Sequence, residues 1–155
     1  MIELGKPAPE LSALDTHGRP VSLGDYRGHS AVLIYFMRAI TCPMCNSHVR
    51  DLASHAVEFG EQDVAVLIAV PEDWQEAAAW VETKSVPYPV LTGGEPHHEF
   101  GLARRMLGSM LQSGTVILDR NGVVRYVDIV TIPAGGYSYR AVTRALVGLH
   151  IDATA

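Results

Sequence analysis

The sequence predicts an α/β fold with one central mixed β-sheet flanked by helices. Residues 31–37 and 64–70 are short, uninterrupted apolar runs, which are typical of strands buried on both faces. Each run is followed by a segment whose apolar residues recur at helical spacing. A strand, a helix and a second strand in this order make a right-handed crossover, so the two runs predict parallel strands.

Turn formers and periodicity assign the elements around these strands. Residues 15–18 are turn formers, and they predict an N-terminal β-hairpin extension in which residues 11–14 pair near residues 21–23. Gly60 is expected to end the first helix, because glycine favours the position after a helix C-terminus. The expected helices cover residues 43–59, 72–84, 97–106 and 139–149, and residues 90–91 form a short strand.

A late hairpin completes the predicted sheet. Residues 115–118 and 123–129 are apolar segments on either side of Asn121-Gly122, which supplies the positive φ values of a tight turn. This hairpin should extend the sheet in an antiparallel sense. The resulting order, a hairpin followed by βαβα and then ββα, is that of a thioredoxin-like sandwich. All 155 residues are expected to form a single domain.

Composition and charge exclude several classes of protein. The formal net charge is −5 and Lys and Arg do not cluster, so no nucleic-acid partner is expected. The longest apolar run, residues 31–37, is far shorter than the roughly 20 residues that a membrane-spanning helix needs. The first residues lack the basic and apolar regions of a signal peptide. We therefore expect a soluble, cytoplasmic protein.

The two cysteines, Cys42 and Cys45, lie where the first buried strand turns into a helix. Pro43 suits the first helical position, which makes Cys42 the N-cap, near free N–H groups and the positive end of the helix dipole. A thiolate is stabilised there, so the pKa of Cys42 should fall. Cys45, one turn into the helix, is expected to be more buried and to act as the resolving thiol in a Cys42–Cys45 disulfide.

Other interpretations of these residues stay open. The cysteines could be inert core residues, or they could join His48 as three zinc ligands, with a fourth from the distant residues 97–99. Residues 97–99 are expected in a solvated loop, however, and we expect neither a metal nor a cofactor. Arg38 ends the buried strand four residues before Cys42, where it could lower a thiol pKa through its charge or lie solvated at the surface.

Three groups of residues, taken in order, resemble a known family. They are LGKPAPEL, DTHG, VSL and YRG between residues 4 and 28, YFMR at 35–38 followed by CPMC at 42–45, and VILD at 116–119 followed by Asn121-Gly122. Together they resemble the alkyl hydroperoxide reductase/thiol-specific antioxidant (AhpC/TSA) family of peroxiredoxins, in the thioredoxin superfamily. The resemblance covers residues 4 to about 126.

This resemblance implies an antioxidant thiol peroxidase. Such an enzyme would reduce a hydroperoxide, become a Cys42–Cys45 disulfide, and be reset by an external dithiol reductant such as a thioredoxin-type protein; a homodimer is possible. Two alternatives stay open: a thioredoxin-like reductase of protein disulfides, and a metal-binding or non-catalytic adaptor of thioredoxin fold. Comparing turnover of hydrogen peroxide with that of a protein disulfide would separate the two enzymes.

The chain departs from the family's usual site. When the family's P-x-x-x-T-x-x-C pattern is laid on Cys45, Arg38 stands at the proline and Cys42 at the threonine. The family's active-site arginine falls near Ser113, and Gly114 stands where thioredoxins carry a cis-proline. The thioredoxin comparison makes Cys42 the nucleophile, whereas the peroxiredoxin alignment makes it Cys45, so for peroxide both remain possible.

Overall fold

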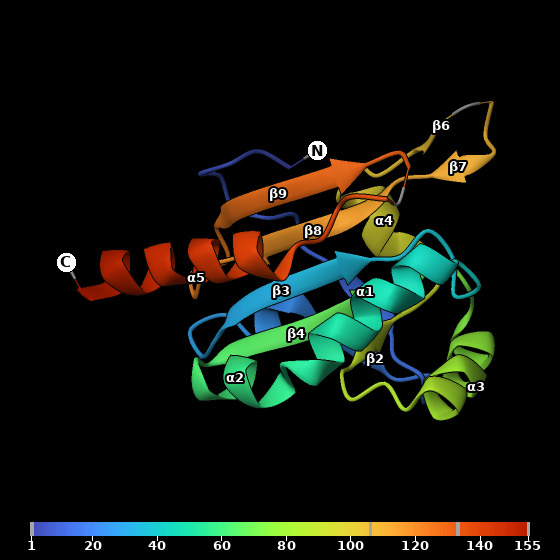
Figure 1. The fold of residues 1–155 in the computed structure, drawn as a ribbon, viewed down its shortest axis with the longest axis horizontal. Coiled ribbons are helices and arrows are strands. Elements are labelled where there is room, and N and C mark those ends of the chain that lie inside the picture. Colours follow the sequence, from blue (N-terminus) through green and yellow to red (C-terminus); the bar gives the residue numbers. More distant parts are fainter. Residues whose placement is uncertain (1, 106, 133, 155) are drawn as a thin grey trace.

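The computed structural model describes residues 2–105, 107–132 and 134–154, with side chains as far as Leu149. Its centre is a five-stranded sheet with the strand order β5-β4-β3-β8-β9 (Figure 1). The strands are β3 (Ala31–Phe36), β4 (Val64–Ala69), β5 (Val90–Leu91), β8 (Ser113–Leu118) and β9 (Val124–Val130). The first three are parallel, and β8 and β9 are each antiparallel to the strand before them in the sheet, which confirms the predicted mixed sheet.

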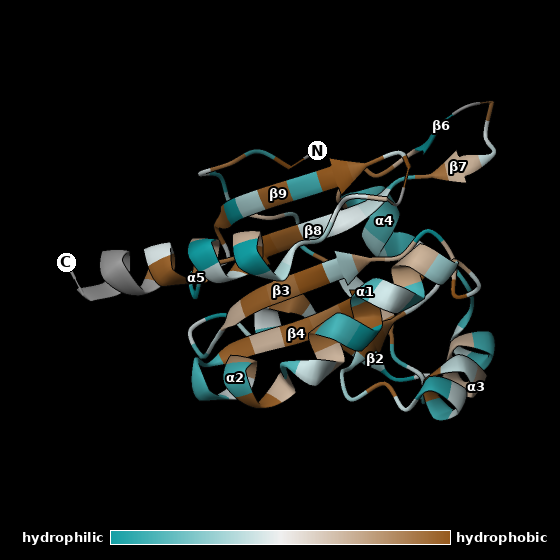
Figure 2. Cartoon of the chain, viewed as in Figure 1, coloured by the Kyte–Doolittle hydropathy of each residue, from teal (hydrophilic) through white to brown (hydrophobic). Residues whose placement is uncertain are grey.

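The residues of β3 alternate between two apolar cores. Leu33 and Tyr35 pack in the core on one face of the sheet, whereas Ile34 and Phe36 pack in the core on the other. Both faces of the sheet are therefore covered, which explains why β3 and β4 are apolar along almost their whole length (Figure 2). Because of this alternation, Tyr35 lies on the same face of the sheet as Cys42 and Cys45.

Helices cover the dithiol face of the sheet. In Figure 1, α1, α2 and α5 lie in front of the strands, and α3 packs Ala77 and Trp80 into the same core. These helices are α1 (Pro43–Ser54), α2 (Ala56–Glu61), α3 (Trp74–Lys84) and α5 (Tyr139–Thr154). Among the described residues, no helix is both long enough and apolar enough to cross a membrane.

The opposite face is covered by the N-terminal segment and one short helix. Ala13 pairs with Val21 in the N-terminal hairpin, as predicted, and this hairpin packs in the second core with Phe100. The elements on this face are β1 (Ser12–Leu14), β2 (Pro20–Ser22), a single 3-10 turn (Leu23–Asp25) and α4 (Glu95–Glu99).

The expected helix over residues 43–59 is wrong in its second half. It is interrupted at His55, whose backbone (φ −110°, ψ 17°) leaves the helical region, and α2 then continues to Glu61. Gly60 lies inside α2 and does not end it. The left-handed conformation that follows this helix is taken instead by Asp63 (φ 55°), whose N–H bonds back to the Gly60 carbonyl.

The helix expected at residues 97–106 is also wrong. The helix α4 ends at Glu99, because Gly101 (φ 78°) turns the chain in the left-handed region. A small antiparallel hairpin follows, formed by β6 (Arg104–Arg105) and β7 (Met110–Leu111), which stands out from the sheet in Figure 1. The end of the expected helix, Met106, lies outside the described residues.

The late hairpin is confirmed, but its turn differs from the predicted one. Only Gly122 of the pair Asn121-Gly122 has a positive φ (79°). The Asp119 carboxylate holds the turn by accepting hydrogen bonds from the backbone N–H groups of Asn121 (2.9 Å) and Val123 (3.0 Å). The connection is therefore longer than a two-residue turn, and the hydrogen bonds to the Asp119 carboxylate stabilise it without a positive φ at Asn121.

Candidate active site

Cys42 is the N-cap of α1, as the sequence predicts. Its backbone is extended (φ −70°, ψ 116°), Pro43 occupies the first helical position, and the Sγ atom accepts a hydrogen bond from the Cys45 N–H at 3.3 Å. The Cys42 side chain is only 2% exposed. Its thiol is thus at the positive end of the helix while being almost covered by protein.

The environment of Cys42 favours its thiolate. Burial raises the pKa of this thiol, but the Cys45 thiol, the Cys45 N–H and the Arg38 guanidinium together outweigh burial, and the net shift is downward. Arg38 lies near enough to the Cys42 sulfur for both its charge and its N–H groups to favour the thiolate. The direction is the one expected for a helix N-cap.

Arg38 lies near the Cys42 thiol and is only partly exposed. Its side chain is half-buried, and Nη1 donates a hydrogen bond to the Met110 Sδ of β7 at 2.9 Å. Its Nε atom is buried and has no hydrogen-bond partner among the described residues. The structure therefore brings together Cys42, Cys45 and Arg38, the three residues that the sequence singles out.

Cys45 lies one turn into α1, next to Cys42. It is fully buried, and its Sγ accepts a hydrogen bond from the Arg38 backbone N–H at 3.4 Å. Burial and the neighbouring Cys42 raise the pKa of Cys45 to about 11, while the Arg38 N–H and the Tyr35 hydroxyl act in the opposite direction. Both cysteines are free thiols in this structure.

Asn46 and Glu72 hold the loop between β3 and α1. The Asn46 Nδ2 donates to the carbonyls of Ile40 (2.8 Å) and Cys42 (2.9 Å), and its Oδ1 accepts from the Trp80 indole (2.9 Å). The Glu72 carboxylate accepts from the Ile40 N–H at 3.1 Å. Sequence reasoning missed both residues, although an asparagine beside the apolar stripe of a helix is a usable signal.

His48 makes a different contact from the metal ligation considered above. Its Nδ1 lies 2.6 Å from the Tyr35 hydroxyl. In the described part of the chain, His, Cys, Asp and Glu side chains do not gather in any group of three or more that could hold a metal ion. Tyr35 is a functional candidate that sequence reasoning missed, because nothing in the apolar run of β3 marks it.

His97 contradicts the expectation of a solvated loop. It lies in α4 with 2% of its surface exposed, and its Nε2 donates a hydrogen bond to the Met37 carbonyl at 2.8 Å. This contact supports the backbone immediately before Arg38. His98 and Glu99, the next two residues, are exposed, so the motif is divided between the core and the surface.

The position of the family's arginine holds a small neutral side chain. Ser113 begins β8 and is fully buried, and its hydroxyl lacks a hydrogen-bond partner within the described residues. Gly114 follows with a φ of 147°, and a Cβ there would lie 2.0 Å from the Asp128 carbonyl oxygen. Glycine is therefore required at residue 114.

A polar pocket of about 370 Å³ opens beside Arg38. It lies between the β3–α1 loop and the β6–β7 hairpin, and it brings Arg104 and Glu72 near Arg38. Its lining residues are Arg38, Ala39, Thr41, Glu72, Arg104 and Leu111, among others. A small polar molecule could enter here and reach the cationic side of the dithiol.

The fold and the dithiol at the helix N-terminus together define a thioredoxin-fold thiol oxidoreductase. The family model for the AhpC/TSA family matches residues 4–127. The chain therefore belongs to the AhpC/TSA family, and the resemblance predicted from its motifs is confirmed.

Known proteins similar to this chain agree with that assignment. It is 26% identical over 133 residues to alkyl hydroperoxide reductase E of Mycobacterium tuberculosis, which covers 83% of this chain and 86% of the relative. It is 29% identical over 94 residues to peroxiredoxin Bcp of Bacillus subtilis, covering 61% of this chain and 59% of that one.

Solved structures confirm the thioredoxin-like fold. The structure of peroxidoxin BcpB from Mycobacterium tuberculosis matches with a TM-score of 0.79 and 22% identity, covering 97% of this chain and 98% of that one. The reduced 2-Cys peroxiredoxin of Plasmodium vivax matches with a TM-score of 0.81 and 20% identity, covering 98% and 99%.

Proposed function

We propose that this protein reduces hydroperoxides through a cycle in which Cys42 attacks and Cys45 resolves. One observation carries the assignment of roles: Cys42 caps α1 beside the Arg38 guanidinium, which favours its thiolate, whereas the pKa of Cys45, one turn into the helix, is raised. Membership of the AhpC/TSA family supports the reaction class. We place Cys42, Cys45 and Arg38 in the catalytic machinery, without a metal or cofactor.

The first step consumes the peroxide. The Cys42 thiolate attacks the terminal oxygen of the hydroperoxide, so that an S–O bond forms and the O–O bond breaks. The leaving oxygen departs with the bonding electrons and takes up a proton, giving an alcohol or water, while Cys42 becomes a sulfenic acid. Arg38 stabilises the negative charge that develops on this oxygen. Ser113 cannot supply that charge, so we expect a slower peroxidase than family members with the complete site.

The second step protects the sulfenic acid. The Cys45 sulfur attacks the Cys42 sulfur, the S–S bond forms and the S–O bond breaks, and the hydroxide leaves as water after gaining a proton. Cys42 Sγ is 3.3 Å from the Cys45 N–H, so the two residues already share one turn of helix. An external dithiol, such as a thioredoxin-type protein, then reduces the disulfide and is itself oxidised. We further propose that the protein works in the cytoplasm as a single domain, with a homodimer as its possible assembly.

Reduction of protein disulfides is the second candidate function. An open groove of about 640 Å³ runs beside Pro43 between α1 and α3, with Ile40, Thr41 and Trp80 in its lining. An extended peptide lying there would pass next to the dithiol.

The test compares substrates and single-cysteine variants. Turnover is measured with hydrogen peroxide, with an organic hydroperoxide and with an insulin-type disulfide, and a sulfenic-acid reagent is added to each variant. We expect peroxide turnover in the wild type, and labelling of Cys42 in Cys45→Ser. Labelling of Cys45 in Cys42→Ser would reverse the roles. Turnover of the disulfide alone would favour the second candidate.

A further inference from the structure

Cys45 has to lose a proton in a place that water does not reach. Its side chain is fully buried, and its pKa of about 11 leaves very little thiolate at neutral pH. In the reduced protein the Cys42 thiolate lies next to the Cys45 thiol as an acceptor. Once Cys42 is a sulfenic acid or a mixed disulfide, that thiolate acceptor is gone. The proton then needs another route.

Tyr35 and His48 form a continuous path from Cys45 toward solvent. The Tyr35 hydroxyl lies in the same core as the Cys45 thiol and acts to lower its pKa, and it lies 2.6 Å from His48 Nδ1. Tyr35 is fully buried in β3, whereas His48 is half-buried in α1, one turn after Cys45. The path thus begins at a covered sulfur and ends at a ring that water contacts.

The protonation states suit a relay. Burial lowers the pKa of His48, so its imidazole is neutral at neutral pH and its Nδ1 can accept the Tyr35 proton. Burial also raises the pKa of Tyr35 far above the usual range, so this hydroxyl stays protonated and can only pass a proton through. A tyrosine hydroxyl can accept a proton from a thiol and at the same time donate its own proton to a histidine, which is what a relay requires.

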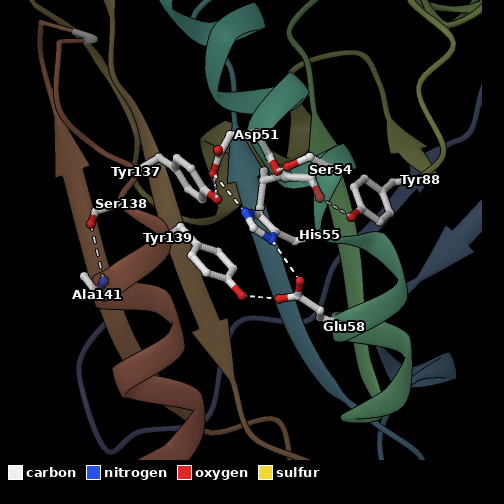
Figure 3. Close-up of polar contacts among 10 residues, drawn as sticks. Asp51, Ser54, His55, Glu58, Tyr88, Tyr137, Ser138, Tyr139 and Ala141 are labelled. Carbon is white, nitrogen blue, oxygen red and sulfur yellow. Dashed lines mark hydrogen bonds and ion pairs between the residues drawn. The ribbon is translucent and has the colours of Figure 1, made fainter.

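The groups around His48 favour the charged product. Asp51 on the same helix and Asp128 on β9 both act on His48 to raise its pKa, against the effect of burial. The Tyr137 ring lies beside the His48 imidazole at 5.4 Å between centroids. Its hydroxyl donates to Asp51 at 2.7 Å (Figure 3). Two carboxylates near the ring therefore stabilise the imidazolium that a proton transfer creates.

We propose that Tyr35 and His48 relay the Cys45 proton to solvent when Cys45 attacks Cys42, an inference that rests on the proposed dithiol cycle. The S–H bond of Cys45 breaks and its proton goes to the Tyr35 oxygen, while the Tyr35 proton goes to His48 Nδ1. The Tyr35 hydroxyl then donates to the new thiolate, and His48 releases a proton to water from Nε2. The thiolate electrons form the S–S bond, and the leaving group departs from the Cys42 sulfur.

A mixed disulfide isolates this step from peroxide chemistry. Dithiobis(nitrobenzoate) reacts with Cys42 and releases one coloured thionitrobenzoate; attack by Cys45 on the mixed disulfide then releases the second. The rate of the second release is measured in Tyr35→Phe and His48→Gln. Tyr88→Phe and His98→Gln are the matched controls: the Tyr88 hydroxyl donates to the Leu52 carbonyl of α1, and His98 is exposed in α4.

We expect both relay variants to slow the second release by about 100-fold at neutral pH, the typical contribution of general acid–base catalysis. The first release and the control variants should be unchanged. In the wild type the second rate should rise through the His48 pKa and then level. In His48→Gln it should keep rising with pH, because only the thiolate fraction of the buried Cys45 then limits it.

Structural damage can be separated from loss of the relay. Added imidazole should restore part of the second release in His48→Ala, which a merely structural histidine would not allow. Wild-type rates and pH profiles in His48→Gln would overturn the relay. If the mixed disulfide shows the relay while peroxide gives no sulfenic acid, the relay holds and the peroxidase proposal fails. If Tyr35→Phe and His48→Gln form the sulfenic acid with peroxide and resolve it at the wild-type rate, the peroxidase proposal holds and the relay fails.

Discussion

Cys42 and Cys45 are neighbours at the start of α1, yet their thiols lie in different electrostatic environments. The Cys42 side has the helix N-terminus and the Arg38 guanidinium, and the pKa of its thiol is lowered. The Cys45 side has buried Tyr35 and apolar strand residues, and the pKa of its thiol is raised to about 11. Burial alone cannot explain the difference, because both side chains are almost fully covered.

The comparison teaches that charge and hydrogen-bond donors, rather than exposure, separate the roles of the two thiols. A thiol stays nucleophilic when buried if fixed donors replace the water that it has lost. The two thiols therefore react in a fixed order. Cys42 is reactive before peroxide binds, and Cys45 becomes reactive only when an acceptor takes up its proton.

Removing the Arg38 guanidinium should have the largest effect on the difference between the pKa values of Cys42 and Cys45. In Arg38→Ala, we expect the rate of reaction with hydrogen peroxide to fall by about 100-fold, because both thiolate stabilisation and leaving-group stabilisation are lost. The pKa of Cys42 should rise while that of Cys45 changes little. Stopped-flow kinetics measures the rate. Thiolate absorbance against pH measures the pKa of Cys42 in a Cys45→Ser background and that of Cys45 in a Cys42→Ser background.

Two further variants sharpen the Arg38 result. Arg38→Lys keeps the charge but loses the guanidinium fork, so its rate should lie between those of Ala and wild type. Arg50→Ala is the control, because Arg50 is exposed on the same helix. An unchanged Cys42 titration in Arg38→Ala would show that the helix N-terminus accounts for the lowered pKa by itself.

His97 supports the Arg38 side through the Met37 carbonyl, and this support should depend on pH. Since Nε2 donates to that carbonyl, a second proton would go to Nδ1, which is buried and lacks a partner among the described residues. Burial therefore lowers the pKa of His97 to about 4 in the folded protein. The unfolded chain binds this proton more readily, so the contribution is complete above about pH 6.5 and is lost as the pH falls toward 4.

The size of this effect follows from the shift. We expect roughly 3 kcal/mol of unfolding free energy to depend on His97 across that window. His97→Gln keeps a donor for Met37 without titrating, so its stability should vary less between neutral and acid pH. Urea denaturation at several pH values measures this, and the exposed neighbour in His98→Gln is the control. Equal acid sensitivity in His97→Gln and wild type would contradict the argument.

The elements that the sequence predicts well are those defined by local chemistry. The apolar runs of β3 and β4 need only a pattern of period and length, and Pro43 after Cys42 marks a helix start by itself. The contact between Tyr35 and His48 joins a strand to a helix, and no local pattern encodes it. The strands β6 and β7 are two residues each and, unlike the equally short but wholly apolar β5, they begin with two exposed arginines, so no apolar run marks the hairpin. The burial of His97 is likewise decided by tertiary packing.

Asn46 holds the two sides of the turn in place, and its replacement should have the smallest of these effects. Asn46→Ala leaves the carbonyls of Ile40 and Cys42 and the Trp80 indole without this partner, which should cost about 1–3 kcal/mol of unfolding free energy. Exposed Ser47→Ala is the control.

Asn46→Asp distinguishes packing from electrostatics at this position. The carboxylate has nearly the amide's shape and can still accept from Trp80, but it cannot donate to the carbonyls of Ile40 and Cys42. Its negative charge lies one turn from the Cys42 sulfur, so the pKa of Cys42 should rise more in Asn46→Asp than in Asn46→Ala. Thiolate titration and urea denaturation of the two variants separate these effects. If Cys42 titrates as in the wild type in both variants, the loop keeps its shape without Asn46, and the contrast between the two thiols depends on Arg38 and the helix N-terminus alone.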